Sequence, residues 1–305
     1  MGLLVVGSIA LDSVATPFGE TADAPGGSAV FFSAAGSILH PVQVVGVVGR
    51  DYPLGVLKSL ERRGVDLTGV QQVPGESFRW KAKYSYDLSS RETLDTRLGV
   101  FAEFRPKLPE AFRDARYVFL GNIDPDLQLG VLDQVTHPAL VACDTMNYWI
   151  SSKRDLLLEL LRHIDLLMIN DSEARELSGE WNIYRAAHWV LERGPRMVVV
   201  KQGEHGALLV NGDSTFKVPA YPLQEVFDPT GAGDAFAGGF MAYLAATDDV
   251  AAPNLRRAMV YGAAMGSFAV EAFGIQGLED VTAADVRARV RAFKDLVHFE
   301  VDGEE

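Results

Sequence analysis

A glycine-rich segment followed by a long apolar run constrains this chain more than any other feature. Residues 228–233 read Asp-Pro-Thr-Gly-Ala-Gly, and Asp234 then precedes an apolar segment, 235–245, that predicts a buried helix. Small residues at a helix start let a ligand approach the backbone closely and leave several N–H groups without partners in the helix. Because these N–H groups and the helix dipole both favour negative charge, the segment predicts an anion site.

Asp234 is the unusual residue at this predicted site, because a carboxylate repels an anion bound beside it. Two interpretations are open from the residues alone: Asp234 caps the helix, or it accepts a proton from a group next to the anion. Gly238 and Gly239 add a second observation, since each costs a helix interior about 1 kcal/mol relative to Ala. We therefore expect another group to approach this helix closely.

Residues 228–241 resemble the second signature of the ribokinase-like (PfkB) family of carbohydrate and nucleoside kinases. The resemblance implies that Asp234 is the catalytic base. It also implies that the loop with Gly231, and the N–H groups from Ala232 through Gly233 to Asp234, hold the transferring phosphoryl group. Two other phosphate-binding patterns are absent from the sequence: the P-loop Gly-Lys-Ser/Thr, and the fingerprint G-x-G-x-x-G after a strand.

The same resemblance implies a nucleotide site at a second segment. Residues 201–207 read Lys-Gln-Gly-Glu-His-Gly-Ala and are similar to a turn that the family places beside the nucleotide. With ATP as the implied phosphate donor, the expected contacts are Lys201, Gly203, Gly206, Asp228 and Thr230. By the same resemblance, Asp228 is expected to help hold a monovalent cation such as K⁺ behind the anion site.

Residues 170–173, Asn-Asp-Ser-Glu, match the family's Asn-x-x-Glu. An amide and a carboxylate three residues apart at a helix start fall on one face of the helix. The resemblance implies that Asn170 and Glu173 order water around Mg²⁺, an ion that takes few protein ligands. The alternative is a capping box, in which the same two side chains close the helix start. The six histidines show no pair at ligand spacing, so no zinc site is expected.

The acceptor is expected to bind near the N-terminus of the chain. Asp12 follows an apolar run, 3–7, that predicts the first strand, and the matching aspartate of the family binds substrate hydroxyls. Gly26 and Gly27 precede a predicted helix at 28–39, where the family's substrate loop also has a glycine pair.

This end of the sequence also departs from the family's pattern. Phe31 stands where the family usually carries an Asn that contacts the sugar, and the Lys that ribokinases have nearby is absent. Phe31 is retained as a candidate substrate contact, together with Asn122 at the end of a predicted strand. The identity of the acceptor therefore stays open.

Alternating strands and helices predict the fold. Polar residues follow three successive predicted strands, 117–121, 140–143 and 166–169, at Asn122, Asp144 and Asn170. Parallel strands bring such residues to one sheet edge, where α/β proteins bind ligands. Other predicted strands are 42–48 and 197–200, with a hairpin over 208–218; predicted helices are 53–63, 126–135, 152–163, 255–270 and 283–297. We expect a three-layer αβα ribokinase-like domain over residues 1–305 with a mostly parallel central sheet.

A different pattern interrupts this alternation. Apolar side chains occupy every second position of 78–88, which predicts a half-exposed strand with an aromatic face that includes Phe78, Trp80, Tyr84 and Tyr86. Residues 92–104 alternate more weakly. We expect a small antiparallel β-lid from segments of about 12–18 and 76–105; the alternative is an edge hairpin of the main sheet. The aromatic face would cover the substrate or a second subunit, so a homodimer through the lid is expected.

Charge and composition limit the partners and the compartment. A formal net charge of −13 argues against binding to nucleic acid. No apolar run approaches the ~20 residues of a membrane span. A single cysteine, Cys143, excludes an internal disulfide and fits a cytoplasmic protein.

Three functions follow from these observations. The first is an ATP-dependent kinase that phosphorylates a hydroxyl of a sugar or sugar derivative. The second is a nucleoside kinase, which Phe31, Phe32 and the aromatic lid favour because they can stack on a base. The third is a catalytically silent ligand sensor on the same fold. An intact Asp234 and glycine loop argue against a sensor, which needs no base.

Overall fold

Nine strands form the central sheet of the computed structural model, which describes residues 2–212 and 214–300. They run in the order β13-β12-β11-β10-β9-β8-β1-β4-β5, and all neighbours are parallel except β11–β12 and β12–β13. The strands are β1 (Leu3–Val6), β4 (Val42–Val48), β5 (Val65–Gln72), β8 (Tyr117–Leu120), β9 (Leu140–Asp144), β10 (Leu166–Asn170), β11 (Met197–Lys201), β12 (Ala207–Asn211) and β13 (Ser214–Val218). The mostly parallel sheet is confirmed. The predicted domain covers residues 1–305, of which Met1, Asp213 and 301–305 lie outside the described residues.

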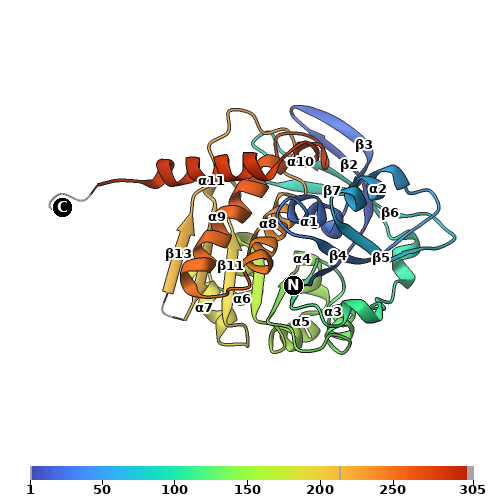
Figure 1. Ribbon diagram of the computed structural model, residues 1–305, viewed down its shortest axis with the longest axis horizontal. Coiled ribbons are helices and arrows are strands. Elements are labelled where there is room, and N and C mark those ends of the chain that lie inside the picture. Colours follow the sequence, from blue (N-terminus) through green and yellow to red (C-terminus); the bar gives the residue numbers. More distant parts are fainter. Residues whose placement is uncertain (1, 213, 301–305) are drawn as a thin grey trace.

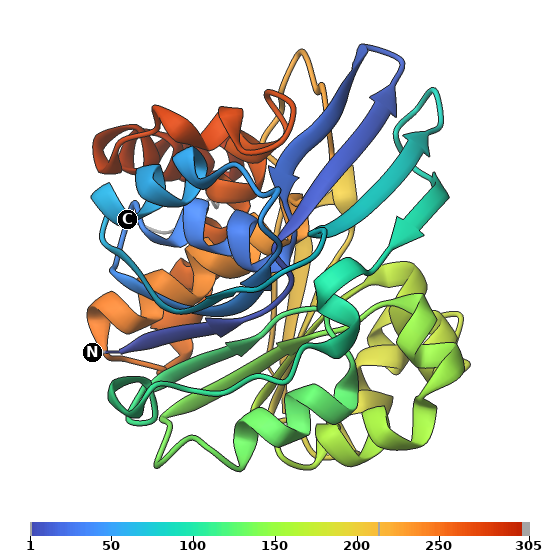
Figure 2. The ribbon, with the colours of Figure 1, turned by 90° about the vertical axis from the view of Figure 1, so that its right-hand side faces the viewer.

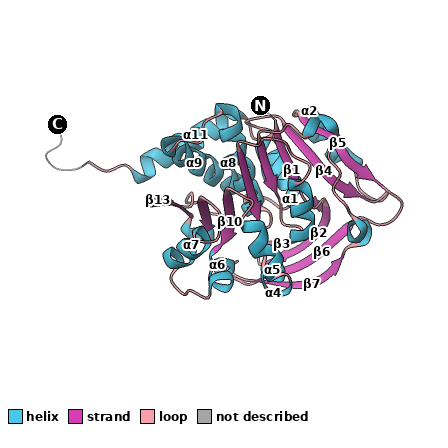
Figure 3. Cartoon of the chain, turned by 90° about the horizontal axis from the view of Figure 1, so that it is seen from below, coloured by secondary structure: helices cyan, strands magenta, loops and turns pink. Residues whose placement is uncertain are grey.

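Helices cover both faces of this sheet (Figures 1 and 3). On one face pack α1 (Ser28–Gly36), α2 (Leu54–Arg62), α8 (Ala232–Thr247), α9 (Ala252–Ala269), α10 (Gln276–Glu279) and α11 (Ala283–Val297). On the other pack α3 (Pro125–Leu132), α4 (Asn147–Ser152), α5 (Arg154–Leu161), α6 (Asp171–Ser178) and α7 (Ile183–Leu191). The predicted helix 152–163 is divided at Lys153, and the predicted helix 28–39 ends at Gly36.

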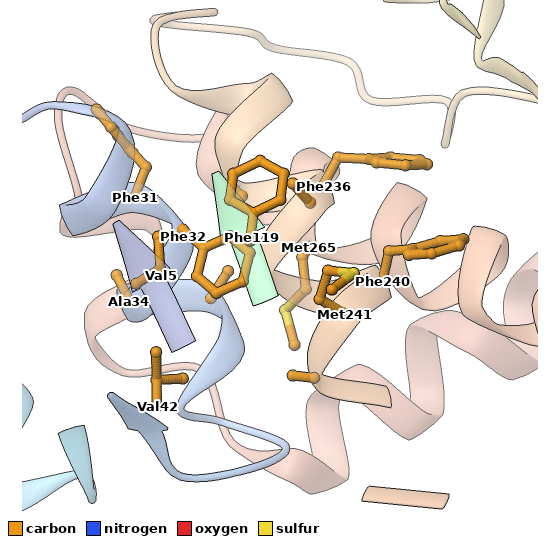
Figure 4. Packing of buried hydrophobic residues seen from close by; sticks show 14 of the residues in the cluster. Val5, Phe31, Phe32, Ala34, Val42, Phe119, Phe236, Phe240, Met241 and Met265 are labelled. Carbon is orange, nitrogen blue, oxygen red and sulfur yellow. The ribbon is translucent and has the colours of Figure 1, made fainter. Parts of the chain in front are cut away.

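The central strands are apolar along their whole length because both of their faces are buried. Successive side chains of a strand point to opposite faces, so Val5 joins the core under α1 and α8, while its neighbour Val6 joins the core under α5 and α7. Phe119 of β8 stacks on Phe32 of α1, with the ring centroids 4.7 Å apart, and Figure 4 shows this contact inside the first core. The sheet thus separates two cores, which makes the three layers.

A second sheet of four strands extends from the body as the lid (Figure 2). Its order is β3-β2-β6-β7, from β2 (Ala10–Thr16), β3 (Gly19–Gly26), β6 (Phe78–Tyr84) and β7 (Arg91–Arg97). The lid prediction is confirmed with three differences. β2 and β6 pair in parallel, β3 was not predicted because its sequence alternates little, and a 3₁₀ turn over Gly99–Glu103 replaces the end of the second predicted strand. The strand ends at Arg97, Leu98 already has helical dihedral angles, and Gly99 follows with a φ of +51°.

The aromatic face of the lid is divided between two environments. Tyr84 is buried against the body of the protein, whereas Tyr86 lies beyond β6 and is 89% exposed. Phe78 and Trp80 are half-buried. The lid thus covers part of the body, and the homodimer through the lid stays a prediction.

The glycines of α8 are explained by helix packing. A Cβ at Gly238 would lie 2.3 Å from the carbonyl oxygen of Phe32 in α1, and a Cβ at Gly239 would lie 2.5 Å from the Cγ of Met265 in α9. The expected close approach to this helix is therefore made by α1 and α9. Among the helices of residues 2–212 and 214–300, none has the combined length and hydropathy that a membrane crossing requires.

Gly238→Ala should destabilise the protein by roughly 2–3 kcal/mol, because a backbone carbonyl cannot yield as a side chain does. The matched control is Gly130→Ala in α3, where a Cβ would meet nothing within 4 Å; it should stabilise the helix by up to about 1 kcal/mol. Urea denaturation of both variants measures the difference. Equal stabilities of the two variants would contradict the close contact between α1 and α8.

Candidate active site

The N-terminus of α8 has the geometry of the predicted anion site. Gly231 precedes the helix with a φ of +74°, a conformation that glycine adopts without strain. The amide of Ala232 already donates to the carbonyl of Pro229 at 3.3 Å. The amides of Gly233 and Asp234 come too early in the helix to have partners within it. These two amides are the ones available to an anion.

Asp228 holds the loop before α8 in place. Its two carboxylate oxygens accept hydrogen bonds from the amide of Thr230 at 2.9 Å and from the amide of Gly274 at 3.3 Å. The side chain is 1% exposed, and burial raises its pKa. Within residues 2–212 and 214–300 no ion pair joins it to a Lys or Arg. A buried carboxylate of this kind fits a cation site, since buried charges are normally paired or bound to a metal ion.

Four successive strands end with polar residues at the same edge of the sheet, and α8 begins there. They are Asn122 after β8, Asp144 in β9, Asn170 in β10 and Lys201 in β11. Lys201 Nζ lies 2.6 Å from Asp144 Oδ2 in a nearly buried ion pair. A Cβ at Gly233 would lie 3.0 Å from Lys201 Nζ. The sequence pattern located this edge, but it did not identify Asp144 as the partner of Lys201.

The electrostatic environment of Asp234 makes it a stronger base than an ordinary aspartate. Burial raises the pKa of its carboxyl to about 7, and the negative charge of Asp144 acts in the same direction, whereas Lys201 and Arg91 lower it. Burial works to lower the pKa of Lys201, but the charges of Asp144, Glu173 and Asp234 raise it above its ordinary value. A charged lysine therefore lies beside a carboxyl that takes up a proton near neutral pH.

Asn170 and Glu173 form the capping box at the start of α6. The Asn170 side-chain oxygen accepts from the Glu173 amide at 2.8 Å, and Glu173 Oε2 accepts from the Asn170 amide at 2.9 Å. Glu173 is 4% exposed, and burial together with the charge of Asp144 raises its pKa to about 7. The capping interpretation is confirmed, and the magnesium role stays a prediction.

The residues around Glu173 suit a metal ion that takes most of its ligands from water and phosphate and few from the protein. Within the described parts of the chain, no group of three His, Cys, Asp or Glu is close enough to hold a metal ion. Glu173 Oε2 is used by the Asn170 amide, which leaves Oε1 as the acceptor for an ion's water molecule. This donor set suits Mg²⁺, whose other ligands would be phosphate oxygens and water.

The lid contributes Asp12 to the same region. The Gly27 amide donates to Asp12 Oδ2 at 3.3 Å, and a Cβ at Gly26 would lie 2.0 Å from that oxygen. Burial raises the pKa of Asp12 to about 7, and the charges of Asp228 and Asp234 add to this effect. The glycine pair is therefore needed to make room for Asp12, and Asp12 lies near enough to Asp234 for the two charges to interact.

Two candidate substrate residues have other contacts. Phe31 is 1% exposed. A Cβ at Gly231 would lie only 2.2 Å from the Cγ atom of the Phe31 ring, so the ring packs directly on this glycine. It supports the glycine turn and offers no surface to a substrate. Asn122 accepts a hydrogen bond from Trp149 Nε1 at 3.1 Å, which holds its amide group in one orientation and leaves the NH₂ group free to donate.

The turn after β11 contains the two predicted nucleotide glycines. Gly206 has a φ of +85°, and a Cβ there would lie 2.0 Å from the carbonyl oxygen of Val218, so this turn packs directly on β13. Gly203 has a φ of +54° and no atom within 4 Å of the position of a Cβ. The backbone at Gly203 is therefore open to a ligand.

Two lid residues, Tyr84 and Arg91, reach the site although neither was among the predicted site residues. The Thr230 hydroxyl donates to the Tyr84 hydroxyl at 3.2 Å, which joins the lid to the loop before α8. Arg91 of β7 lies near enough to Asp234 to lower its pKa. The alternation of 78–88 indicated the inward face of Tyr84, but no local pattern pointed to Arg91.

Comparison with known proteins gives a consistent result. The model of the pfkB family carbohydrate kinases matches residues 5–281. The cytidine kinase of Thermococcus kodakarensis is 30% identical over 248 residues, which are 79% of this chain and 88% of that protein. The solved nucleoside kinase of Methanocaldococcus jannaschii has a TM-score of 0.77 at 22% identity, and the match covers 96% of this chain and 99% of that one. A putative ribokinase II from E. coli, solved with ATP and Mg²⁺, has a TM-score of 0.79 at 22% identity, covering 95% and 99%. These structures confirm the predicted fold.

The site geometry predicts how Asp234 titrates. Its carboxyl carbon, followed by ¹³C NMR, should titrate with a midpoint of about 7 instead of the ordinary 3.8. Lys201→Met should move this midpoint to higher pH, because it removes a cation that favours the carboxylate. Asp285 is the internal control, since hydrogen bonds from Thr282 lower its pKa and it lies far along the chain on α11. An Asp234 midpoint near 3.8, or one that Lys201→Met leaves in place, would contradict this account.

Proposed function

The chain belongs to the pfkB family of ATP-dependent carbohydrate and nucleoside kinases, and on that premise we propose that its phosphate acceptor is a nucleoside. The cytidine kinase of T. kodakarensis supports this choice, because it is 30% identical over most of both chains, against 26% for ribokinase and deoxyribokinase relatives that match as widely. The nucleoside alternative thus has better support than the sugar that the sequence first suggested. The observation that carries the chemistry is Asp234 at the N-terminus of α8, beside the Lys201–Asp144 ion pair.

Asp234 is proposed to accept the proton of the acceptor hydroxyl. As that oxygen bonds to the γ-phosphorus, the bond from this phosphorus to the bridging oxygen breaks and ADP leaves with the electron pair. A pKa of about 7 makes the carboxylate a good proton acceptor at neutral pH. Asp12 is proposed to orient the acceptor through a second hydroxyl, since the Gly27 amide binds its Oδ2 and leaves Oδ1 as an acceptor.

The backbone at the start of α8 is proposed to stabilise the transferring group. The free amides of Gly233 and Asp234, aligned with the helix dipole, suit the charge that spreads over the phosphoryl oxygens. Lys201 adds a positive charge from the sheet side. Gly203, with open space beside its backbone, is proposed to contact the nucleotide.

Two cations are proposed to assist. Mg²⁺, when bound, would neutralise charge on the β- and γ-phosphates; Glu173 would hold it through water, and Asn170 keeps Glu173 in place through the capping box. A monovalent cation such as K⁺ is proposed near Asp228, a buried carboxylate without a cationic side-chain partner among the described residues.

Asp234→Asn tests the base. It keeps the shape of the side chain and removes the proton acceptor, so kcat should fall by roughly 10²–10⁴-fold with nucleotide affinity little changed. The control is Asp285→Asn, at the same third position of α11, where the aspartate accepts hydrogen bonds from Thr282. This variant should lose some stability and keep its kcat. Similar losses of kcat in both variants would mean that helix capping, and not a base, explains the effect.

A coupled ADP-release assay with Mg-ATP tests the acceptor. Ribonucleosides, both pyrimidine and purine, should exceed ribose, deoxyribose and hexoses in kcat/KM by at least ~10-fold, because a bound base supplies contacts that a free sugar lacks. Reactions without acceptor, and with Asp234→Asn, give the background. Preference for a free sugar would overturn the nucleoside proposal while leaving the kinase chemistry intact.

A further inference from the structure

Arg91 is a lid cation whose charge is not neutralised by a neighbouring carboxylate. It is the first residue of β7, the edge strand of the lid, and none of the ion pairs within residues 2–212 and 214–300 includes it. Its guanidinium carbon lies 5.5 Å from the ring centroid of Trp80, within the range of a cation–π contact. Trp80 on the neighbouring strand thus contacts the guanidinium but supplies no opposite charge.

The pairing of β6 with β7 directs Arg91 toward the loop before α8. Arg91 is paired with Tyr84 in the register of the two strands, and the Tyr84 hydroxyl accepts a hydrogen bond from Thr230 at 3.2 Å. Burial raises the pKa of this hydroxyl, while the charge of Arg91 and a hydrogen bond from it lower this pKa. Arg91, Tyr84 and Thr230 therefore form one chain of contacts from the lid to the glycine turn.

The charge of Arg91 also acts on the start of α8. It lowers the pKa of the Asp234 carboxyl there, and the contacts through Tyr84 and Thr230 lead to the glycine turn before this helix. The amides of Gly233 and Asp234 lie in the first turn of α8, where N–H groups have no partners within the helix. A lid cation and the free amides of α8 therefore belong to the same part of the site.

We propose that Arg91 contacts the transferred phosphoryl group from the lid side and stabilises its charge in the transition state. Lys201 approaches from the sheet side, and its ion pair with Asp144 at 2.6 Å offsets part of its charge. Arg91 has no carboxylate partner among the described residues, and its planar fork can match two phosphoryl oxygens at once. It exchanges no proton in this role. The inference rests on the kinase function proposed above.

Three variants test the role of Arg91 in the full-length protein. Arg91→Met removes the charge and keeps much of the length, and Arg91→Lys keeps the charge without the fork. Arg97→Met is the matched control, because Arg97 lies on the same strand, is exposed and pairs with Asp95 at 2.7 Å. Three quantities are measured. The first is kcat with the best acceptor, and the second is the pH profile of kcat/KM. The third is the ratio of the Kd values for Mg-ADP and for Mg-AMP-PNP, a non-hydrolysable ATP analogue, by calorimetry without acceptor.

Arg91→Met should lower kcat by roughly 10²–10³-fold and weaken Mg-AMP-PNP about 10-fold more than Mg-ADP, because only the analogue carries a γ-phosphate. Arg91→Lys should recover part of both effects, and Arg97→Met should match the wild type. The acid limb of kcat/KM should move to higher pH in Arg91→Met, since Asp234 loses a cation that favours its carboxylate; a purely structural residue would not move it.

The proposal is overturned if Arg91→Met keeps kcat within about threefold of the wild type and leaves the ratio of Kd values unchanged. It is also overturned if Arg97→Met has the same effects, because a general loss of positive charge on the lid would then suffice. The binding ratio needs no acceptor, so it remains decisive even if nucleosides prove to be the wrong substrates. A wild-type protein that binds no Mg-AMP-PNP would overturn both this inference and the proposed function.

Discussion

The direct contact between the backbones of α1 and α8 determines where the active-site groups lie. The carbonyl of Phe32 reaches Gly238 so closely that no side chain fits between them, and the ring of Phe31 lies on Gly231 at the start of the same helix. α1 itself begins at Gly27, whose amide binds Asp12. α1 thus positions the phosphate-binding end of the active site through its middle residues and the acceptor-binding end through its start.

The second determinant is a concentration of negative charge at the sheet edge. Asp12, Glu173 and Asp234 all have pKa values raised to about 7, and burial is the first cause in each case. A polyphosphate can enter such a region only with cations beside it. Lys201 on β11 and Arg91 on the lid supply positive charge, and the overall charge of −13 means that the protein as a whole does not attract the nucleotide. The attraction is local.

Sequence reasoning succeeded where a local pattern has a local cause. Long apolar runs predicted the parallel strands, and their polar ends predicted the edge that holds Asn170 and Lys201. The Asp234 segment predicted the helix N-terminus with its free amides. Sequence reasoning failed where a feature is caused by a contact with a distant part of the chain. The role of Phe31 depends on Gly231, two hundred residues away, and the reason for Gly238 lies in α1. The strand β3 lacks an apolar pattern because both of its faces are largely exposed, and Arg91 acquires its position from a strand pairing that no spacing reveals.

The lid carries part of the acceptor site within its own strands. Asp12 belongs to β2, and β3 runs directly into Gly26 and Gly27. Any displacement of this small sheet relative to the central one therefore moves the carboxylate that is proposed to hold the acceptor. A movement that uncovers the acceptor site would therefore also separate the groups that hold the acceptor, so a phosphorylated product would lose its cover and its binding contacts together.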